Sequence, residues 1–504
     1  MKLKQLLACV PGAKVTGDDA IEIGSLCYDS RQVTPGAVFF ALRGVKSDGT
    51  EYVASAVKGG AVAIVADRPC AVAGVACVEV PDARRAMSLM AAVFYGTPTG
   101  EIPLVGITGT NGKTTTTYLV EGIMAQAGIP AAVLGTISYR FGGTSIPAPN
   151  TTPESVDLQR ILRELVDQGA KGAVMEVSSH SLEQRRADGC IFDVAIFTNL
   201  TRDHLDYHLD MESYYQSKLR LFTDLLTPSA HKPLRRAVVN LDDPYGARIA
   251  ADSAAPVLTY AVNAPADLSV AEVNFSVHGI RCRLNSPVGE ININSDLLGR
   301  FNLYNMMGAV GAGLALGIPK EAIEAGIEGH KKVPGRLERV QNDQGIIVLV
   351  DYAHTGDALE NVLSTIAELK TDRIITIFGC GGDRDKGKRP VMGEIAARYS
   401  DLAIVTSDNP RTEDPQAILE DVRAGIPTGL KEYSLEELEG GVREKGFATI
   451  ESRRTAVRTA ILAARPGDIV LLAGKGHEDY QIVGTEKFHF DDREEAAAAL
   501  KLRA

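Results

Sequence analysis

Short apolar runs alternate with helix-length segments along most of this chain. The runs lie at residues 37–42, 61–66, 102–107, 172–177, 194–198, 345–351, 373–378, 402–406 and 468–473. Runs that are largely apolar throughout, rather than alternating with polar residues, are typical of strands buried in parallel sheets. The pattern therefore predicts an α/β protein with parallel sheets in at least two domains.

Two stretches dense in glycine and proline interrupt this series, at residues 95–103 and 330–336. They place domain boundaries near residues 98 and 333. A length of 504 residues also favours roughly three domains. We therefore expect a first domain at residues 1–98, a central phosphate-loop domain with a parallel sheet at residues 99–333, and a C-terminal Rossmann-like domain at residues 334–504.

Composition narrows the class of protein. No apolar run reaches the ~18 residues that span a bilayer, and the N-terminal apolar stretch is too short for a signal peptide, so we expect a cytoplasmic protein without membrane insertion. The seven cysteines never form a CxxC pair, which favours reduced thiols over disulfides or a structural zinc. A net charge of −11 argues against a nucleic-acid surface. Small molecules are therefore the expected partners.

Residues 106–115, which read GITGTNGKTT, carry the strongest chemical signal. They follow an apolar run and precede a helical pattern with Leu119 and Ile123 on one face. In such a loop the backbone N–H groups cradle phosphate, Lys113 neutralises its oxygens, and the Thr114 hydroxyl can bind Mg²⁺. The common GxxxxGK(S/T) spacing is not met strictly, because its first glycine would fall at Ile107. The alternative is a plain glycine turn between a strand and a helix.

Polar residues follow two other apolar runs, where ligands sit in open parallel sheets. Glu176 ends one run and is a candidate ligand of Mg²⁺, directly or through water; the alternative is a helix-capping or surface glutamate. The segment at residues 198–208 reads TNLTRDHLDYH and contains His204 and His208. A single histidine is more often structural, but this combination favours a site. No NKxD-like guanine motif occurs, so we expect ATP rather than GTP.

These motifs together resemble a known family. In chain order, the segments at residues 106–114, 199–208, 240–243, 299–305, 334–338 and 351–354 resemble the signature of the Mur ligases, the ATP-dependent amino-acid-adding enzymes of peptidoglycan synthesis. Within that family, the segments at residues 29–31, 150–153, 379–386, 408–411 and 474–478 resemble the members that join meso-diaminopimelate to UDP-N-acetylmuramoyl-L-alanyl-D-glutamate.

The resemblance implies a mechanism. ATP would phosphorylate the free carboxylate of the D-glutamate, and the incoming amine would displace phosphate through a tetrahedral intermediate. Thr114 and Glu176 would hold one Mg²⁺, and His204 would help to hold a second. The lysine at position 218 is carbamylated by CO₂ in this family and would bridge to Mg²⁺ as an anion. From the residue pattern alone, Lys218 would be a solvated helix residue.

The resemblance also implies the binding residues, and we expect a monomer. Those expected at ATP are Gly109, Thr110, Asn111, Gly112, Lys113, Thr114, Asn302 and His354. Those expected at the UDP-linked substrate are Ser30, Asn150, Thr151, Thr152, Ser178, Gln184 and Arg186. Those expected at diaminopimelate are Arg384, Asp408, Asn409, Pro410, Arg411, Gly474 and Glu478. Lys113, Glu176, His204 and Lys218 would be the catalytic residues.

Arg411 is the expected specificity residue. A guanidinium can hold a carboxylate through two parallel hydrogen bonds, and meso-diaminopimelate differs from lysine by one distal carboxylate. A lysine ligand would leave a buried arginine unpaired. The alternative for residues 408–411 is an ordinary Asx turn before a helix.

Two other classes of function stay open. A folylpolyglutamate synthetase-like ligase would share the ATP site and use another acceptor, although the segments at residues 29–31 and 408–411 argue against it. A non-enzymatic nucleotide-dependent switch is the other class. The combination of Glu176, His204 and Lys218 argues against the switch.

Overall fold

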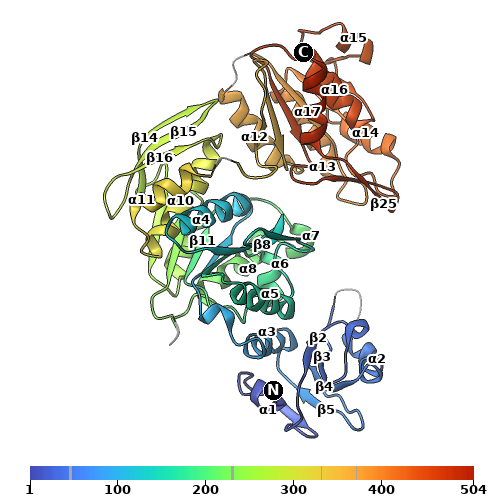
Figure 1. The fold of residues 1–504 in the computed structure, drawn as a ribbon. Coiled ribbons are helices and arrows are strands. Elements are labelled where there is room, and N and C mark those ends of the chain that lie inside the picture. Colours follow the sequence, from blue (N-terminus) through green and yellow to red (C-terminus); the bar gives the residue numbers. More distant parts are fainter. Residues whose placement is uncertain (45–47, 229–231, 331, 370–371, 504) are drawn as a thin grey trace. The chain divides into compact units, whose positions relative to one another are not determined.

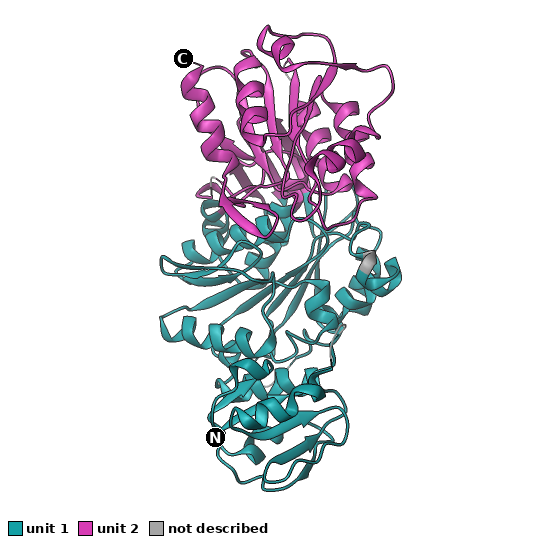
Figure 2. Cartoon of the chain, turned by 90° about the vertical axis from the view of Figure 1, so that its right-hand side faces the viewer, with its two compact units in different colours: residues 1–269, 285–289, 305–326 teal, residues 270–284, 290–304, 327–504 magenta. Residues whose placement is uncertain are grey.

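The computed structural model describes residues 1–504 apart from residues 45–47, 229–231, 331, 370–371 and 504. The described chain forms two compact units, shown in teal and magenta in Figure 2. Unit 1 comprises residues 1–269, 285–289 and 305–326, and unit 2 comprises residues 270–284, 290–304 and 327–504. The expected division into three domains at residues 98 and 333 stays a prediction.

The N-terminal part of unit 1 is built on a five-stranded sheet with the order β1-β5-β4-β3-β2. Its strands are β1 (Lys14–Thr16), β2 (Ser25–Cys27), β3 (Ala37–Phe40), β4 (Ala61–Ala66) and β5 (Ala76–Glu79), and its helices are α1 (Leu3–Leu7), α2 (Val53–Lys58) and α3 (Ala83–Phe94). Successive side chains of β3 point to opposite faces, so Val38 and Phe40 pack with α1 and α3 while Phe39 packs with α2.

A larger sheet in unit 1 carries the glycine loop. Its strands run in the order β13-β12-β11-β6-β10-β7-β8-β9, and they are parallel from β13 to β7. The bounds are β6 (Leu104–Thr108), β7 (Ala131–Leu134), β8 (Ser138–Phe141), β9 (Thr144–Pro147), β10 (Gly172–Glu176), β11 (Val194–Phe197), β12 (Arg236–Asn240) and β13 (Val257–Ala261). The glycine loop follows β6, which has the parallel strands β11, β12 and β13 on one side and β10 and β7 on the other.

Helices cover both faces of this sheet. Their bounds are α4 (Lys113–Gln126), α5 (Ser155–Asp167), α6 (Ser179–Glu183), α7 (Leu205–His208), α8 (Met211–Thr223), α9 (Gly246–Asp252), α10 (Arg300–Ala315) and α11 (Lys320–Glu328). Apolar residues of α5, α6, α8 and α9 share one core with the sheet. The part of α10 in unit 1 approaches the sheet closely, because a Cβ at Gly311 would lie 2.5 Å from Val238 Cγ1.

Unit 2 contains a seven-stranded sheet with the order β17-β18-β23-β19-β20-β22-β21. The strands of this unit are β15 (Gly279–Asn285), β16 (Ile291–Ser295), β17 (Glu338–Val340), β18 (Ile347–Asp351), β19 (Ile374–Phe378), β20 (Leu402–Val405), β21 (Lys431–Glu432), β22 (Gly446–Thr449), β23 (Ile469–Ala473), β24 (Tyr480–Val483) and β25 (Glu486–His489), together with most of β14 (Leu268–Ser276). Only β17 is antiparallel in the seven-stranded sheet. The strands β24 and β25 form a separate hairpin.

Two layers of helices enclose that sheet (Figure 1). Helices α12 (Gly356–Leu369), α13 (Lys388–Tyr399) and α14 (Pro415–Arg423) bury apolar residues on one face. Helices α15 (Leu435–Glu439), α16 (Arg453–Ala463) and α17 (Asp492–Leu502) do so on the other. The α/β class predicted from the apolar runs is confirmed, and each of those runs contains a strand. Within the described residues, no helix combines the length and hydrophobicity needed to cross a bilayer.

Candidate active site

The predicted strand, glycine loop and helix are confirmed at β6 and α4. Gly109 and Gly112 have φ angles of 148° and 89°, which side chains rarely tolerate. A Cβ at Gly109 would lie 1.8 Å from Thr198 Oγ1, and one at Gly112 would lie 2.2 Å from Asn305 Oδ1. The loop therefore requires glycine at both positions, and it leads directly into the positive end of α4, as a phosphate-binding loop does.

Two lysine ammonium groups meet at this loop. Lys113 Nζ donates to the carbonyl oxygens of Gly109 at 2.9 Å and Thr110 at 2.8 Å, and Lys218 Nζ donates to Gly109 O at 2.9 Å. Lys218 lies on α8, is only 1% exposed and has its ammonium 4.5 Å from the centre of the Tyr214 ring. Burial, together with the nearby Lys113 charge, holds the pKa of Lys218 well below its ordinary value. The interpretation of Lys218 as a solvated helix residue is therefore wrong.

Glu176 lies at the end of β10, beside the strand that leads into the glycine loop. Its carboxylate is 1% exposed and accepts hydrogen bonds from the N–H and hydroxyl of Thr136 at 3.0 and 2.9 Å. A Cβ at Gly135 would lie 2.4 Å from Glu176 Oε1, so a glycine makes room for this side chain. The alternative of a surface glutamate is wrong, because Glu176 is buried at the edge where ligands sit in such sheets.

His204 belongs to a group of rings next to this edge. Its ring centre lies 5.0 Å from that of His180 and 6.0 Å from that of Tyr214. The backbone at His204 has a φ of 55°, an uncommon conformation for a residue other than glycine. His208 is buried instead and makes a 2.9 Å hydrogen bond with Ser179 Oγ. Of the two histidines in the segment, His204 is therefore the more accessible one.

The oxygen donors of Thr114 and Glu176 suit a hard cation such as Mg²⁺ that is bound largely through phosphate. Among the described residues, no group of three or more histidine, cysteine or acidic side chains is arranged to hold a metal. Mg²⁺ is usually held by one or two carboxylates, waters and substrate phosphates rather than by a protein cage. The nearly buried Thr114 hydroxyl follows Lys113 in the loop, and the buried Glu176 carboxylate lies on the neighbouring strand, which suits that mode.

Most residues predicted at the UDP-linked substrate are joined by hydrogen bonds. Thr152 Oγ1 donates to Glu176 O at 2.8 Å and accepts from Ser178 N–H at 3.2 Å. Arg186 donates to Thr152 O at 2.9 Å and, through two nitrogens, to Gln184 Oε1. Thr151 contacts the Thr136 hydroxyl at 3.1 Å, and Asn150 O accepts from Tyr139 Oη. Ser30 begins a short 3-10 helix after β2.

The two remaining residues predicted at the nucleotide belong to unit 2. Asn302 is fully buried on α10 and donates from Nδ2 to Leu298 O at 2.8 Å. His354 follows β18 and makes a 2.9 Å hydrogen bond from Nδ1 to Tyr352 O. Burial and the nearby Lys388 charge lower the pKa of His354, so its imidazole is neutral at pH 7.

The residues predicted at diaminopimelate gather at the carboxyl ends of β20 and β23. Asn409 Nδ2 donates to Glu478 Oε2 at 3.1 Å, and Asp408 lies 3.1 Å from the ammonium of Lys475. Burial alone would raise the pKa of Asp408, but the charges of Lys475 and Arg453 hold it below its ordinary value. Burial raises the pKa of Glu478, with Asp408 adding to the effect.

Arg411 lies next to this cluster. Its backbone has a φ of 53°, and its guanidinium donates to Gly382 O at 2.9 Å. The main chain of Arg411 is hydrogen-bonded to β24 and the turn after it, through Ile482 O at 3.1 Å and Gly484 N at 2.7 Å. The remaining residues of the set follow strands of the same sheet: Arg384 after β19, Pro410 after β20 and Gly474 after β23.

The alternative of an Asx turn at residues 408–411 is not what the structure shows. The Asp408 carboxylate faces Lys475, and the Asn409 amide bonds to residues far along the chain, including Ile482 N–H at 2.9 Å. The following helix, α14, has its own N-terminal cap, Asp414. The polar side chains of the segment are therefore used across the sheet edge and not locally.

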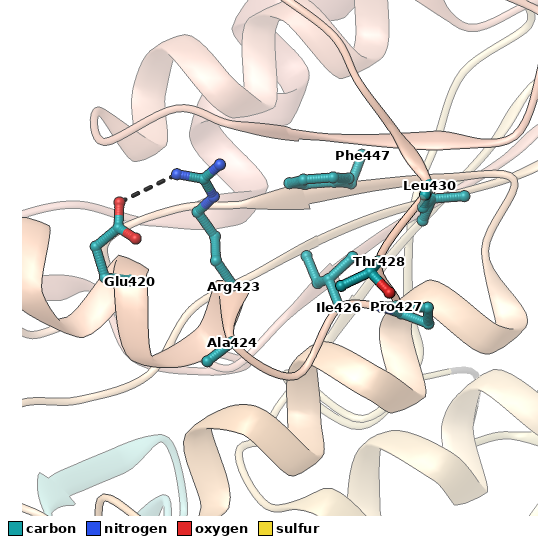
Figure 3. A pocket seen from close by; sticks show the side chains of 9 residues that line it. Glu420, Arg423, Ala424, Ile426, Pro427, Thr428, Leu430 and Phe447 are labelled. Carbon is teal, nitrogen blue, oxygen red and sulfur yellow. Dashed lines mark hydrogen bonds and ion pairs between the residues drawn. The ribbon is translucent and has the colours of Figure 1, made fainter.

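A surface pocket of about 380 Å³ lies elsewhere in unit 2 (Figure 3). Its walls include Arg423, Ile426 and Phe447, and Arg423 is paired with Glu420 at 3.1 Å. Phe447 is near the start of β22, so the pocket lies at the amino ends of the strands, opposite the edge where ligands sit in such sheets. It contains none of the predicted site residues.

Two residues at these sites were missed by sequence reasoning. Thr136 orients Glu176, and Lys475 contacts both Asp408 and Asn409. Nothing in the sequence marked Thr136 as a site residue beyond its position after an apolar segment. Lys475 lies inside the GKGHE segment, whose glycines and glutamate drew attention while the lysine resembled an ordinary surface cation.

Three family models match the chain in order. The model described as "Mur ligase family, catalytic domain" matches residues 22–95, "Mur ligase middle domain" matches residues 107–313, and "Mur ligase, glutamate ligase domain" matches residues 335–476. Lys113, Glu176, His204 and Lys218 lie in the second match, and Asp408, Asn409, Arg411 and Lys475 lie in the third.

Curated relatives and a solved structure agree with these matches. The UDP-N-acetylmuramoyl-L-alanyl-D-glutamate–2,6-diaminopimelate ligase of Geobacter metallireducens is 64% identical over 99% of this chain and 98% of its own length. The protein of that name from Geobacter sulfurreducens is 62% identical over 99% of both chains. A solved structure of a ligase with the same name is 32% identical, covers 100% of this chain and 99% of its own, and superposes with a TM-score of 0.72. The chain therefore belongs to the Mur ligase family.

Proposed function

We propose that this protein is an ATP-dependent ligase that joins meso-diaminopimelate to UDP-N-acetylmuramoyl-L-alanyl-D-glutamate. Relatives of that name match the whole chain, and they support the choice of substrates. The observation that carries the chemistry is the meeting of the Lys113 and Lys218 ammonium groups at one carbonyl of the glycine loop. A purely structural loop between a strand and a helix has no need of a second, buried lysine at the same carbonyl, whereas a site for phosphoryl transfer uses such ionisable groups.

The proposed reaction begins with attack of the D-glutamate carboxylate on the γ-phosphorus of ATP. An O–P bond forms, the bond to the β-γ bridging oxygen breaks, and ADP leaves. Lys113 neutralises charge on the transferring group. The amine of diaminopimelate then attacks the acyl phosphate carbon, and a tetrahedral intermediate collapses to an amide, releasing phosphate and a proton. One Mg²⁺ held by Thr114 and Glu176, and a second that His204 would help to hold, would supply charge stabilisation at the phosphates.

Lys218 is proposed to act as a carbamate. Its neutral amine would attack the carbon of CO₂, forming an N–C bond, while one C=O pair becomes a carboxylate oxygen and a proton passes to water. Burial of the amine against a carbonyl and an aromatic ring favours the neutral form that this reaction needs. The product turns a repulsive neighbour of Lys113 into an attractive one, and it adds an anionic ligand for Mg²⁺.

The binding roles follow the same assignment. Gly109, Thr110, Asn111, Gly112, Asn302 and His354 are proposed at ATP. Ser30, Asn150, Thr151, Thr152, Ser178, Gln184 and Arg186 are proposed at the UDP-linked substrate, and Arg384, Asp408, Asn409, Pro410, Arg411, Gly474 and Glu478 at diaminopimelate. We also propose three domains with boundaries near residues 98 and 333, and a cytoplasmic monomer. The sequence pattern supports the domain boundaries, and the use of ATP supports the cytoplasmic location. Light scattering tests the monomer.

Phosphate release tests the function directly. Purified protein is given ATP, Mg²⁺ and the UDP-linked dipeptide, with meso-diaminopimelate or L-lysine in parallel. Release with diaminopimelate alone is expected. Phosphate release with lysine would support the ligase assignment but refute the role of Arg411 in specificity. Release with neither amino acid would refute the proposed function and favour a folate-type ligase or a switch.

A further inference from the structure

A fully buried lysine lies beneath the cluster proposed to bind diaminopimelate. Lys475 is 0% exposed, and its ammonium contacts Asp408 Oδ1 at 3.1 Å and Asn409 Oδ1 at 3.3 Å. It also donates to Tyr480 O at 2.7 Å, on the first residue of β24. One cation thus reaches the side chains of two adjacent residues in the proposed site, and it does so from the end of β23, which β19 separates from β20 in the sheet.

The contacts determine which way the Asn409 amide faces. Its Oδ1 accepts from Lys475 and from Ile482 N–H, so its Nδ2 is left to donate to Glu478 Oε2 at 3.1 Å. An amide without these two donors can rotate, because oxygen and nitrogen occupy similar positions. Lys475 and β24 together therefore hold Asn409 and Glu478 in one arrangement.

Charge balance gives Lys475 a second effect. Arg453 is also buried, but it is paired with Asp492 at 2.6 Å, and that pair is fully enclosed. Lys475 is then the cation in direct contact with Asp408, while Arg453 and Arg411 act on Asp408 and Glu478 from farther away. An amino-acid end brings one ammonium and one carboxylate. The ammonium matches the carboxylates of Asp408 and Glu478, and the carboxylate matches Arg411.

We propose that Lys475 is the positioning residue of the amino-acid site, where it fixes Asp408 and Asn409 and sets the charge that receives the ammonium of diaminopimelate. The proposal rests on the proposed function and goes beyond it by assigning a role to a side chain that the ligand does not touch. Without Lys475, the buried Asp408 carboxylate loses the cation in direct contact with it, which favours its protonation and loss of its hold on the ligand.

The test compares Lys475→Met with a matched control, Lys232→Met. Lys232 is a buried lysine of unit 1 that contacts two carbonyl oxygens and Asp193, and it lies outside the proposed sites. Phosphate release is measured with diaminopimelate varied, then with ATP varied, and thermal melting is recorded for each variant. We expect Lys475→Met to raise KM for diaminopimelate about tenfold, the size of one charge-assisted bond, with KM for ATP within about twofold. Lys232→Met should lower only the melting temperature.

A double-mutant cycle separates positioning from simple loss of stability. Asp408→Asn is expected to raise KM for diaminopimelate, and adding Lys475→Met should raise it by less than about threefold more. The double variant removes the buried Asp408 charge together with the cation that contacts it, so it keeps the test available if Lys475→Met alone does not fold. The proposal would be overturned if Lys475→Met left KM for diaminopimelate unchanged or raised KM for ATP equally. It would also be overturned if the KM increase of the double variant equalled the product of the increases in the two single variants. If the wild type shows no diaminopimelate-dependent release, the proposed function fails first, and this inference fails with it.

Discussion

Lys113 and Lys218 donate to the same acceptor, the carbonyl oxygen of Gly109, each at 2.9 Å. Two like charges at one buried oxygen repel, and the arrangement is stable only if one of them is neutral or modified. The lowered pKa of Lys218, which follows from burial and from Lys113, is the expected response. This relationship makes Lys218 the most sensitive point at which to test the proposed chemistry.

Replacing Lys218 with alanine should reduce turnover at least about a hundredfold, the usual cost of removing one transition-state contact. Added short-chain carboxylates, such as acetate, should restore part of the rate, because they can enter the space and supply the missing anion. The measurement is phosphate release with increasing carboxylate. Lys232→Met is the control, and its rate should not respond to added carboxylate. An active Lys218→Ala variant would contradict both the carbamate and the ligase mechanism.

Replacing Arg411 with lysine should raise KM for meso-diaminopimelate by about tenfold to a hundredfold, because an ammonium cannot form the two parallel hydrogen bonds of a guanidinium. KM for ATP should change little. Arg423→Lys is the matched control, since Arg423 lies in the same unit in exposed ion pairs with Glu420 and Glu432. The kinetics of both variants are compared at saturating ATP. Equal KM values for diaminopimelate in the two variants would remove Arg411 from the specificity argument.

Replacing Gly112 with alanine should abolish nucleotide binding or unfold the loop. The added Cβ would lie 2.2 Å from Asn305 Oδ1, and the φ of 89° is unfavourable for alanine. Gly128→Ala separates the two causes, because Gly128 also has a positive φ, of 72°, but no atom lies within 4 Å of its Cβ position. We expect Gly128→Ala to lower stability by about 1 kcal/mol and to leave ATP binding intact. Nucleotide titration by fluorescence, with thermal melts, measures both effects.

His477 should make unit 2 less stable in mild acid. Burial, with help from Arg336 and Arg493, lowers the pKa of His477 from 6.5 to about 4. Between these values the unfolded chain binds the proton and the folded chain does not, so stability falls as the pH drops from 6.5 toward 4. His477→Asn should flatten this dependence, by up to about 3 kcal/mol at pH 4 in denaturant titrations. The exposed His278→Asn is the control, and an unchanged pH profile in His477→Asn would contradict the assignment.

The sequence predicted well wherever a residue type is demanded by local geometry. Gly109 and Gly112 were identifiable because a phosphate loop needs glycine where the backbone turns to positive φ. Glu176 was identifiable because it ends an apolar run that becomes β10, and the edge of a parallel sheet is a general place for ligands. In each case a rule about one segment was enough.

Prediction failed where a property arises only from packing. Lys218 and Lys475 are both lysines in unremarkable local sequence, yet both are buried by segments distant along the chain. Lys218 is enclosed because α8 lies against the glycine loop, and Lys475 because β24 and Asp408 close over it. Burial of a charged side chain depends on partners that a local pattern does not contain, so only the family resemblance pointed to Lys218 and nothing pointed to Lys475.

The backbone of Arg411 is held by main-chain bonds to Ile482 and Gly484, whereas its guanidinium donates to the carbonyl oxygens of Gly382 and Asn409. The β24–β25 hairpin therefore holds position 411 through main-chain atoms, which every amino acid has. Its side chain can be exchanged without dismantling the strands around it. Folding and the choice of amino acid are thus separable at this position, which makes it a natural starting point for redirecting the ligase toward other diamino acids.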